Sequence, residues 1–441
     1  HICLDKEAGK AYISLATASR IAIVNLETRE LKGYINTEFN PGGLALSKKQ
    51  GLLYVADRLP EGSVHLISLH NNKVVKSIKS GHTPDALIIT PDESILLAAN
   101  RFSNSISIID LRKNHLLKHI QVDRDPKALA ISPDGQFVAV ANNIPNAAAT
   151  DLYLSAKVSL IDMKTQELVK SISLVNGSQS IEGLTFSKDG KYIYASHILS
   201  RNTLPTTQIE RGWINSNAVS IIDSEKQEYY STVLLDNFNQ GAANPTGMVL
   251  SDDGEKLSIT LSGVHEICTI DLTEMHNRLK GRDYGSYEVA NDLRFLNGIK
   301  TRIPTAGKSP RHLTYWNNDL LVCSYFSTTL EIIHTKDTTE KSIEIVLGQE
   351  PDMDEVRRGE LLFSDADLCF QKWQSCISCH PDARVDGLNW DLLNDCAGNP
   401  KNSKSMLYAH STPPAMSTGI RESAEIAVRS GIKYILFTET E

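Results

Sequence analysis

Four of the seven cysteines of this chain lie in one short stretch, as Cys369, Cys376, Cys379 and Cys396. Two residues separate Cys376 from Cys379, and His380 follows directly, in the order C-x-x-C-H. This spacing lets both thiols reach the two vinyl groups of one porphyrin, and it places the histidine under the iron as the proximal ligand. The motif therefore predicts one covalently bound haem c, attached through Cys376 and Cys379 and ligated by His380.

Paired cysteines also occur in zinc sites and redox dithiols. A zinc site would require a second pair of ligands, and no other C-x-x-C spacing occurs in the sequence. A thioredoxin-like dithiol would require a βαβ context, which this stretch lacks. Cys369 and Cys396 flank the motif, and we expect them to form a disulfide because thioether attachment takes place in an oxidising compartment; two unpaired thiols are the alternative. The other three cysteines lie in strand-like apolar contexts and are typical of small buried residues: Cys3, Cys268 and Cys323.

The first three quarters of the chain consist of a repeat with a period of roughly 40 residues, which is typical of propeller blades. Each copy reads as four short strands, with an Asp-Gly hairpin after the first strand in three copies, for example at Asp134-Gly135. A four-stranded blade cannot bury both faces alone, so the copies must stack radially into a closed ring. We therefore predict an all-β, seven-bladed β-propeller over residues 1–348. The stretches "YVAD" at 54–57 and "VANN" at 140–143 resemble the YVTN-type propeller repeat family, which implies the fold but hardly the function.

Polar residues recur at equivalent places near one mouth of the predicted ring. Those at the end of the second strands are Asp57, Asn100, Asn142, His197, Ser262 and Tyr325, with Arg58 and Arg101 following two of them. Those at the start of the innermost strands are Asp85, Lys127, Glu182, Thr246 and Arg311. One interpretation is a polar funnel that holds a ligand or a docking partner; the alternative is that the mouth is polar only because it is hydrated.

Two blades carry long insertions between their second and third strands, at residues 143–156 and 198–217. Both would project from the same end of the ring, and loops of this length usually cover something. We expect them to pack on the predicted haem domain, with Arg211 and Trp213 as candidate anchors.

From about residue 349 the repeat stops. Short amphipathic helices are indicated at 353–363 and 421–437, with proline-containing loops between them. This pattern predicts a small all-α c-type cytochrome domain over residues 349–441, in which the porphyrin supplies much of the core.

Four stretches of this segment carry a resemblance: "RRGELLF" (357–363), "CISCHPDARVDGLNW" (376–390), "GNPKNSKSMLYAHSTPPAM" (398–416) and "GIRESAEIAVRSG" (419–431). They resemble the first haem domain of the bacterial dihaem cytochrome c peroxidase superfamily, which includes the dihaem enzyme that matures methylamine dehydrogenase. In that superfamily one haem takes electrons from a small donor protein and the other reduces hydrogen peroxide.

The segment departs from that family in two ways. Ser430 and Gly431 stand where some family domains carry a distal methionine, so Met416, His410 and Met406 are, in this order, the remaining candidates for the sixth iron ligand, with an open iron site as the alternative. The family also carries two haems, whereas this chain has one C-x-x-C-H motif. We expect that the chain is truncated before a second haem domain; a monohaem variant is the alternative.

These observations favour an extracytoplasmic haem oxidoreductase of the cytochrome c peroxidase type, whose propeller docks a substrate or an electron-donor protein. A peroxidatic iron requires a nearby group that moves the peroxide proton, and Glu422, Glu425 and His410 are the local candidates. A calcium ion between the domains is also considered. The alternative function is a non-catalytic propeller binding protein with an electron-relay haem. A third is a propeller-cytochrome enzyme with a second cofactor in the propeller.

Composition excludes other classes of function. The net charge of -8 and the pI near 5.9 disfavour a nucleic-acid partner, which would require a basic face. No apolar run approaches the roughly 20 residues that a membrane-spanning helix needs. We expect a periplasmic or otherwise extracytoplasmic protein whose natural N-terminus lies upstream of His1, where a signal sequence or membrane anchor would be found.

Overall fold

The computed structural model describes residues 1–204, 214–281, 286–335, 340–349, 352–391, 398–416 and 418–438. Seven four-stranded antiparallel sheets follow one another in chain order, so the predicted seven-bladed propeller is confirmed. In the first three sheets the strands are β1 (Ile2–Asp5), β2 (Lys10–Leu15), β3 (Arg20–Asn25), β4 (Glu30–Asn36); β5 (Pro41–Ser47), β6 (Leu52–Asp57), β7 (Ser63–Ser68), β8 (Lys73–Lys79); β9 (Pro84–Ile89), β10 (Ile95–Asn100), β11 (Ser105–Asp110) and β12 (His115–Gln121).

The strands of the next two sheets are β13 (Pro126–Ile131), β14 (Phe137–Asn142), β15 (Lys157–Asp162), β16 (Glu167–Ser173); β17 (Ser178–Phe186), β18 (Tyr192–Ser200), β19 (Asn215–Asp223) and β20 (Glu228–Leu234). The last two sheets contain β21 (Pro245–Leu250), β22 (Lys256–Leu261), β23 (Glu266–Asp271), β24 (Lys300–Pro304); β25 (Pro310–Trp316), β26 (Asp319–Ser324), β27 (Thr329–Ile333) and β28 (Ile343–Val346). Two helices, α1 (Leu272–Lys280) and α2 (Ser286–Val289), lie between β23 and β24, and the repeat pattern did not indicate them.

The core of the propeller lies between neighbouring sheets. One apolar cluster joins Tyr54 and Leu66 of the second sheet to Leu96 and Ile109 of the third. A corresponding cluster joins Ala11 and Val24 of the first sheet to Leu321 and Leu330 of the last, and this contact closes the ring. Closure leaves each sheet covered on both faces, which is why a unit that cannot stand alone is stable in the ring.

The predicted Asp-Gly hairpins lie between the first two strands of three sheets. Gly135 has a φ of 72°, in the left-handed region that glycine enters without a steric penalty. Asp134 supports the turn by accepting hydrogen bonds from the Ser132 hydroxyl (2.6 Å) and the Gln136 backbone N–H (3.0 Å).

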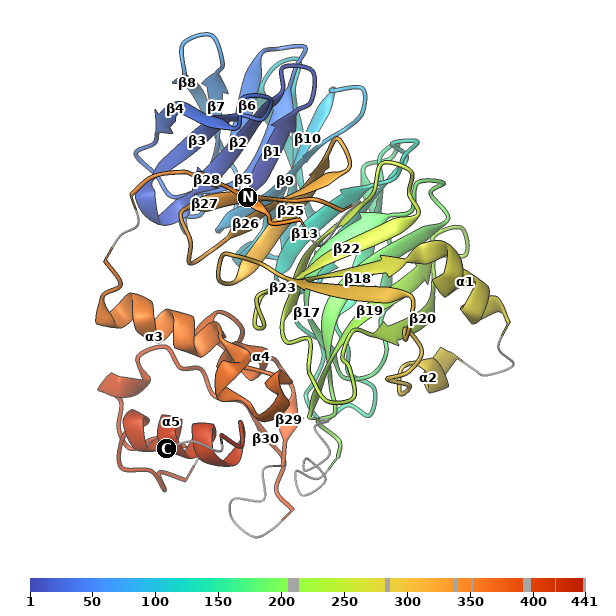
Figure 1. Ribbon diagram of the computed structural model, residues 1–441, viewed down its shortest axis with the longest axis vertical. Helices are drawn as coiled ribbons and strands as arrows, with labels where there is room; N and C mark the ends of the chain where they lie inside the picture. Colours follow the sequence, from blue (N-terminus) through green and yellow to red (C-terminus); the bar gives the residue numbers. More distant parts are fainter. Residues whose placement is uncertain are drawn as a thin grey trace.

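The segment after β28 packs at one end of the propeller (orange to red in Figure 1). It contains α3 (Glu355–Ser364), α4 (Cys376–Cys379) and α5 (Ala424–Tyr434), and several one-turn 3-10 helices. The expected helices at 353–363 and 421–437 correspond to α3 and α5. The expectation of a purely helical segment is wrong, because β29 (Asn389–Trp390) and β30 (Lys401–Asn402) form a short antiparallel ladder.

Among the described residues, no helix has both the length and the apolar character that crossing a bilayer would require.

Candidate functional site

The C-x-x-C-H motif forms one helical turn that is held at its start by the propeller. Ser375 precedes α4, and its backbone N–H donates to the hydroxyl of Ser378 (3.0 Å), in a capping box. Asn244, just before β21, donates to the Ser375 hydroxyl (2.8 Å) and accepts from the Ser378 hydroxyl (2.7 Å). Gln179 of β17 donates to the Ser378 carbonyl oxygen (2.6 Å). The turn is therefore anchored by buried side chains from two blades.

Both predicted attachment cysteines lie on this turn, and each is half-buried. Residues three apart on a helix share a face, so the two sulfur atoms are available on one side of the turn. Burial raises the pKa of the Cys376 thiol to about 11 and raises that of Cys379 further. The Asn215 side-chain amide lies 3.5 Å from the Cys379 sulfur. Both side chains are therefore neutral thiols at neutral pH.

His380 follows the last residue of α4 and is also half-buried. Its Nδ1 lies 3.4 Å from the backbone carbonyl oxygen of Arg384. A proton on Nδ1 directed at this carbonyl leaves the lone pair on Nε2, the arrangement that metal-ligating histidines commonly adopt. In the part of the chain that the structure describes, Nε2 has no hydrogen-bond partner.

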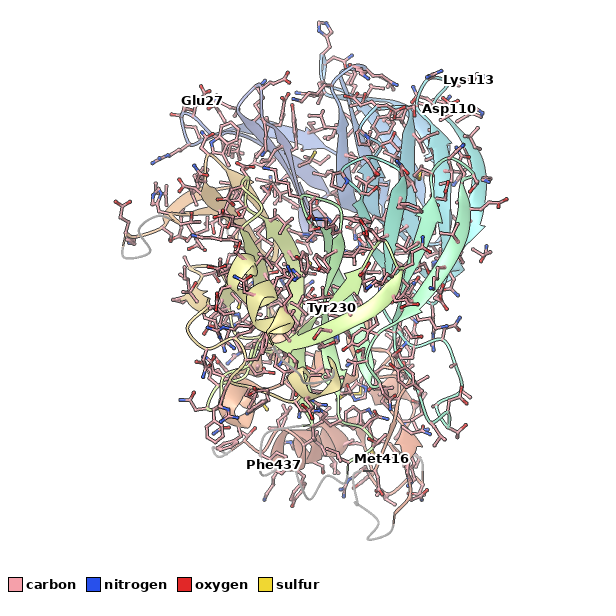
Figure 2. All side chains as sticks on the ribbon, turned by 90° about the vertical axis from the view of Figure 1, so that its right-hand side faces the viewer. Glu27, Asp110, Lys113, Tyr230, Met416 and Phe437 are labelled. Atoms are coloured by element: carbon pink, nitrogen blue, oxygen red, sulfur yellow. The ribbon has the colours of Figure 1, made fainter. Side chains whose placement is uncertain are left out.

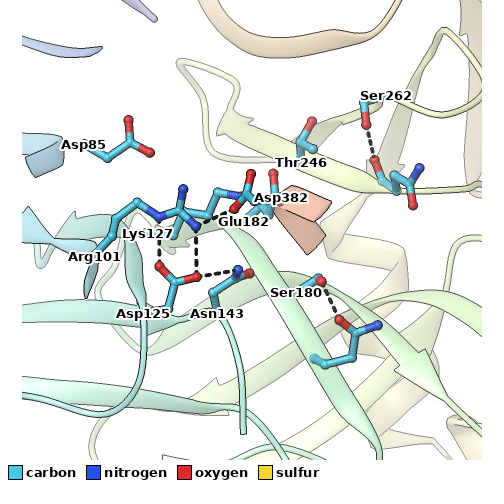
Figure 3. Close-up of polar contacts among 12 residues, drawn as sticks. Asp85, Arg101, Asp125, Lys127, Asn143, Ser180, Glu182, Thr246, Ser262 and Asp382 are labelled. Atoms are coloured by element: carbon cyan, nitrogen blue, oxygen red, sulfur yellow. Dashed lines mark hydrogen bonds and ion pairs between the residues drawn. The ribbon is translucent and has the colours of Figure 1, made fainter. Parts of the chain in front are cut away.

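Two residues beyond His380, the carboxylate of Asp382 enters the mouth of the propeller (Figure 3). Arg101 forms a two-pronged ion pair with Asp125 (2.8 and 2.9 Å), and its Nη2 also donates to Asp382 (2.5 Å). Lys127 donates to Glu182 and lies 3.7 Å from Asp382. Burial alone would raise the pKa of Asp382, but Lys127 and Arg101 together hold it well below the usual range.

The residues predicted to start the innermost strands do gather around this mouth. A small cavity of about 40 Å³ lies beside Asp382. The predicted mouth residues that line it are Lys127, Glu182, Thr246, Arg311 and Ser262, and Ile377 of the C-x-x-C-H turn lines it from the other side. The polar funnel therefore contacts the chain's own C-terminal segment.

Several residues predicted at the ends of the second strands have structural roles instead. Asn100 and Asn142 are fully buried and hydrogen-bond to serines of neighbouring strands. His197 is also buried, with Nδ1 3.1 Å from the Ile198 carbonyl oxygen and Nε2 2.8 Å from the Ser220 hydroxyl. Burial lowers the pKa of His197 to about 4. These three positions belong to the blades and take no part in the site.

The two long insertions pack on the C-terminal segment, as predicted. Asn389 of β29 donates to the Ala149 carbonyl oxygen in the first insertion (3.1 Å). Leu154 and Ile214, one from each insertion, pack with Leu388 and Trp390 in a buried apolar cluster that Cys379 adjoins. The candidate anchors Arg211 and Trp213 lie outside the described residues.

The remaining predicted site residues are not joined to His380. Glu422, Glu425 and His410 are exposed, and no hydrogen bond or ion pair links them to His380 within the described residues. Met416 is 38% exposed. Figure 2 places it with Phe437 at the end of the molecule away from Asp110 and Lys113. Met406 lies near the motif, since its backbone N–H donates to the Ala383 carbonyl oxygen (2.8 Å). All of these roles stay predictions.

The predicted disulfide also stays a prediction, because Cys396 lies outside the described residues. Cys369 is buried beside Trp373 and Leu436, and burial raises the pKa of its thiol to about 11.

One further cluster has the composition of a metal site: His265, Asp365 and Asp367 offer ligand atoms within 4.8 Å of one another. The Ser309 backbone N–H donates to Nδ1 of His265 (3.0 Å), so Nε2 carries the proton and points it at Asp365 (3.3 Å). A neutral histidine in this tautomer has no lone pair on Nε2 to offer a metal. His265 and Asp365 therefore form a hydrogen bond between the propeller and the C-terminal segment.

Sequence reasoning missed the side chains that anchor the motif. Asn244, Gln179 and Asn215 belong to three different loops or strands and have no common spacing. Arg101 was noted only as a neighbour of Asn100. The available signal was the acidic residue at 382, directly after the C-x-x-C-H-P stretch, opposite a predicted mouth that contains cations.

Comparison with known proteins identifies similar sequences and a similar fold. A family model described as "Lactonase, 7-bladed beta-propeller" matches residues 68–152. Hydrazine synthase subunit beta from Kuenenia stuttgartiensis is 25% identical over 185 residues, which are 41% of this chain and 48% of that subunit. The match thus spans about half the length of that relative.

A solved structure of Kuenenia stuttgartiensis hydrazine synthase aligns with a TM-score of 0.69 at 24% identity, over 76% of this chain and 95% of that chain. At this identity the alignment shows the fold. The chain therefore contains a seven-bladed β-propeller that holds a C-x-x-C-H turn at its mouth, and 185 of its residues are similar in sequence to hydrazine synthase subunit beta.

Proposed function

We propose that residues 376–380 bind one haem c and that the chain is an extracytoplasmic haem oxidoreductase of the cytochrome c peroxidase type. The observation that carries this proposal is the single turn α4, which presents Cys376 and Cys379 three residues apart and is followed directly by His380. The contact of His380 Nδ1 with the Arg384 carbonyl supports the role of Nε2 as the axial ligand.

The apolar surface of the C-terminal segment also fits a porphyrin. Helix α5 has apolar residues on one face, yet none of its residues is buried. Exposed large apolar side chains of this segment include Leu407, Met416, Ile420, Ile426, Val428, Tyr434 and Phe437. Where exposed apolar side chains of this kind form one patch, another group commonly covers them. A porphyrin is flat and largely apolar, so it would be a suitable core for these short elements.

When bound, the haem supplies one-electron redox chemistry. The protein's part is to hold and shield it. Cys376 and Cys379 would form the thioether bonds, and His380 would ligate the iron. Trp390 and Leu388 exclude water from the side of Cys379. Peroxide reduction would also need a proton carrier, for which His410, Glu422 and Glu425 stay candidates, as Met416 does for the sixth ligand.

The similarity to a hydrazine synthase subunit favours a second candidate function for the propeller. In this proposal the blades form contacts within a multi-subunit oxidoreductase, and the haem relays electrons for a partner protein. We place either assembly outside the cytoplasm, since covalent haem attachment takes place there. The proposal also includes a small electron-donor protein as partner. It includes a second haem domain and a calcium ion between the domains as further components.

An optical spectrum of protein matured in a periplasm that attaches haem c tests the assignment. We expect a covalent haem spectrum for the wild type and none for the Cys376→Ala/Cys379→Ala variant. Cys323→Ala, which removes a propeller cysteine, serves as the matched control and should keep the haem. A wild-type protein without covalent haem would overturn the assignment.

Addition of peroxide separates the two functions. An open, high-spin ferric iron that converts to a ferryl species would support the peroxidase. A low-spin iron with two axial ligands, inert to peroxide, would favour the electron relay and support Met416 as the sixth ligand.

A further inference from the structure

We propose that the propeller mouth positions the haem-binding turn, and that the ion pairs of Asp382 with Arg101 and Lys127 lock the turn onto the mouth. The docking of the turn is independent of the proposed function. The effect on a bound haem rests on the proposed function, and proteolysis of the haem-free chain tests the docking separately.

The mouth has an unbalanced set of charges until Asp382 enters it. Four cationic side chains face this region beside the N-terminal amino group of His1, whose pKa burial lowers, and three propeller acids accompany them. The cations are Arg58, Arg101, Lys127 and Arg311, and the acids are Asp85, Asp125 and Glu182. Asp382 supplies the fourth negative charge. Unpaired charges are costly away from water. The C-terminal segment is therefore most stable when its 3-10 turn places the Asp382 carboxylate among the cations of the mouth.

The ion pairs of Asp382 are close enough to His380 in the chain to influence the position of the C-x-x-C-H motif. Arg101 is only 3% exposed and is already oriented by its two-pronged pair with Asp125, so its third hydrogen bond is directed at a defined point. Asp382 lies two residues after His380, and the 3-10 turn Pro381–Ala383 links them. A change in the position of Asp382 is therefore transmitted to His380 through a short, turned backbone.

The hydrogen bonds from Asn244 and Gln179 hold the other end of the same turn. The motif is thus attached on both sides, by neutral hydrogen bonds before His380 and by ion pairs after it. The propeller side chains at both attachment points, Gln179, Asn244 and Arg101, are buried. The thiols and the imidazole lie between them and are positioned before any haem is attached, which reduces the ordering that attachment must impose.

The docking is tested by limited proteolysis of the haem-free chain of residues 1–441. Asp382→Asn keeps the shape of the side chain and removes its charge. We expect cleavage within residues 349–441 to accelerate by about tenfold, because local opening becomes easier, while cleavage within the blades does not change. Glu360→Gln is the matched control, since Glu360 is an exposed acid of the same segment paired with Arg357 (2.8 Å). It should stay within about twofold of wild type.

A charge-restoring variant distinguishes an ion-pair lock from a general loss of packing. Arg311→Met in the Asp382→Asn background removes a cation of the same cavity that no ion pair joins to an acid among the described residues, so the charges balance again without leaving Glu182 unpaired. We expect this double variant to recover most of the protection that Asp382→Asn loses. Cleavage of Asp382→Asn at the wild-type rate, or a double variant cleaved faster than the single one, would overturn the docking proposal.

The effect on haem is read from the midpoint potential and the ferric electron paramagnetic resonance spectrum of loaded protein. Loss of a nearby negative charge favours the reduced iron, so Asp382→Asn should have a higher potential and a shifted resonance spectrum. Glu360→Gln should match the wild type. If Asp382→Asn carries haem with wild-type potential and resonance, the positioning role fails, while the protease result still decides the docking. Absence of haem from the wild type would be a failure of the proposed function alone.

Discussion

The propeller and the C-terminal segment bury their apolar side chains to very different extents. In the propeller, Tyr54, Leu53 and Ile106 are completely shielded from solvent between sheets. In α5, by contrast, Ile426 is 40% exposed and Tyr434 is 59% exposed. The blades cover one another because they repeat, whereas the C-terminal segment is a single copy whose helices are too short to cover one another.

The few large side chains that the C-terminal segment does bury lie mostly against the propeller. Trp373 and Leu436 pack with Leu199, Leu234 and Ala290, and Cys369 belongs to the same cluster. Trp390 and Leu388 pack on the two insertions. The C-terminal segment therefore depends on partners outside its own helices, namely the propeller on one side and, in our proposal, a porphyrin on the other.

The largest effect is expected from Ile106→Ala in the propeller. Ile106 packs with Leu97 and Ile108 of its own sheet and with Val138 and Val140 of the next. Its truncation should lower the free energy of unfolding by about 2–5 kcal/mol, through lost burial and the cavity left behind. Urea unfolding of the haem-free chain, followed by circular dichroism, measures this change. Val356→Ala, at a residue that is 82% exposed, is the control and should remain within about 0.5 kcal/mol.

A smaller, pH-dependent effect is expected from His197, which is buried between strands. Its imidazole is neutral at pH 7 in both states, but the unfolded ring gains a proton near pH 6.5 and the folded ring only near pH 4. The unfolded chain therefore binds more protons between these values, and the free energy of unfolding falls as the pH falls. His197 should account for a loss of about 2 kcal/mol between pH 7 and pH 5.

Urea unfolding of His197→Gln at pH 7 and pH 5 measures the contribution of His197. The free energy of unfolding of this variant should fall by about 2 kcal/mol less than that of wild type on acidification. His70→Gln changes an exposed histidine and should lose as much as wild type. Equal losses for wild type and His197→Gln would show that the histidine does not control the acid response.

The smallest change in stability is expected for a substitution in α5 of the C-terminal segment. Ile426→Ala in the haem-free chain should change the free energy of unfolding by less than about 0.5 kcal/mol, because the side chain is not buried. In haem-loaded protein the same variant should cost about 1 kcal/mol or more if the porphyrin covers this face. Thermal unfolding of both forms measures the difference. A variant with equal cost in both forms would place the porphyrin away from Ile426.

Residues close in sequence were predicted well. The Asp134-Gly135 turn and helices α3 and α5 follow from local signals: a glycine at positive φ, and Asp354 and Ser423 as N-caps. The β29–β30 ladder was not predicted, because each of its strands has only two residues. Contacts such as that of Gln179 with Ser378 could not be predicted, since nothing in the spacing of these residues relates them.

The period of the blades and the C-x-x-C-H motif can be read from the sequence, because both depend on residues at fixed short spacings. The position of that motif, by contrast, follows from how the chain folds. Arg101 and Asp382 are 281 positions apart, and they meet because closure of the ring brings the innermost strands to one mouth. The same closure decided that Asn100 and His197 are buried within blades, although their repeat positions suggested the mouth. A repeat specifies how neighbouring copies stack, whereas the mouth is formed by all copies together with the segment that closes it.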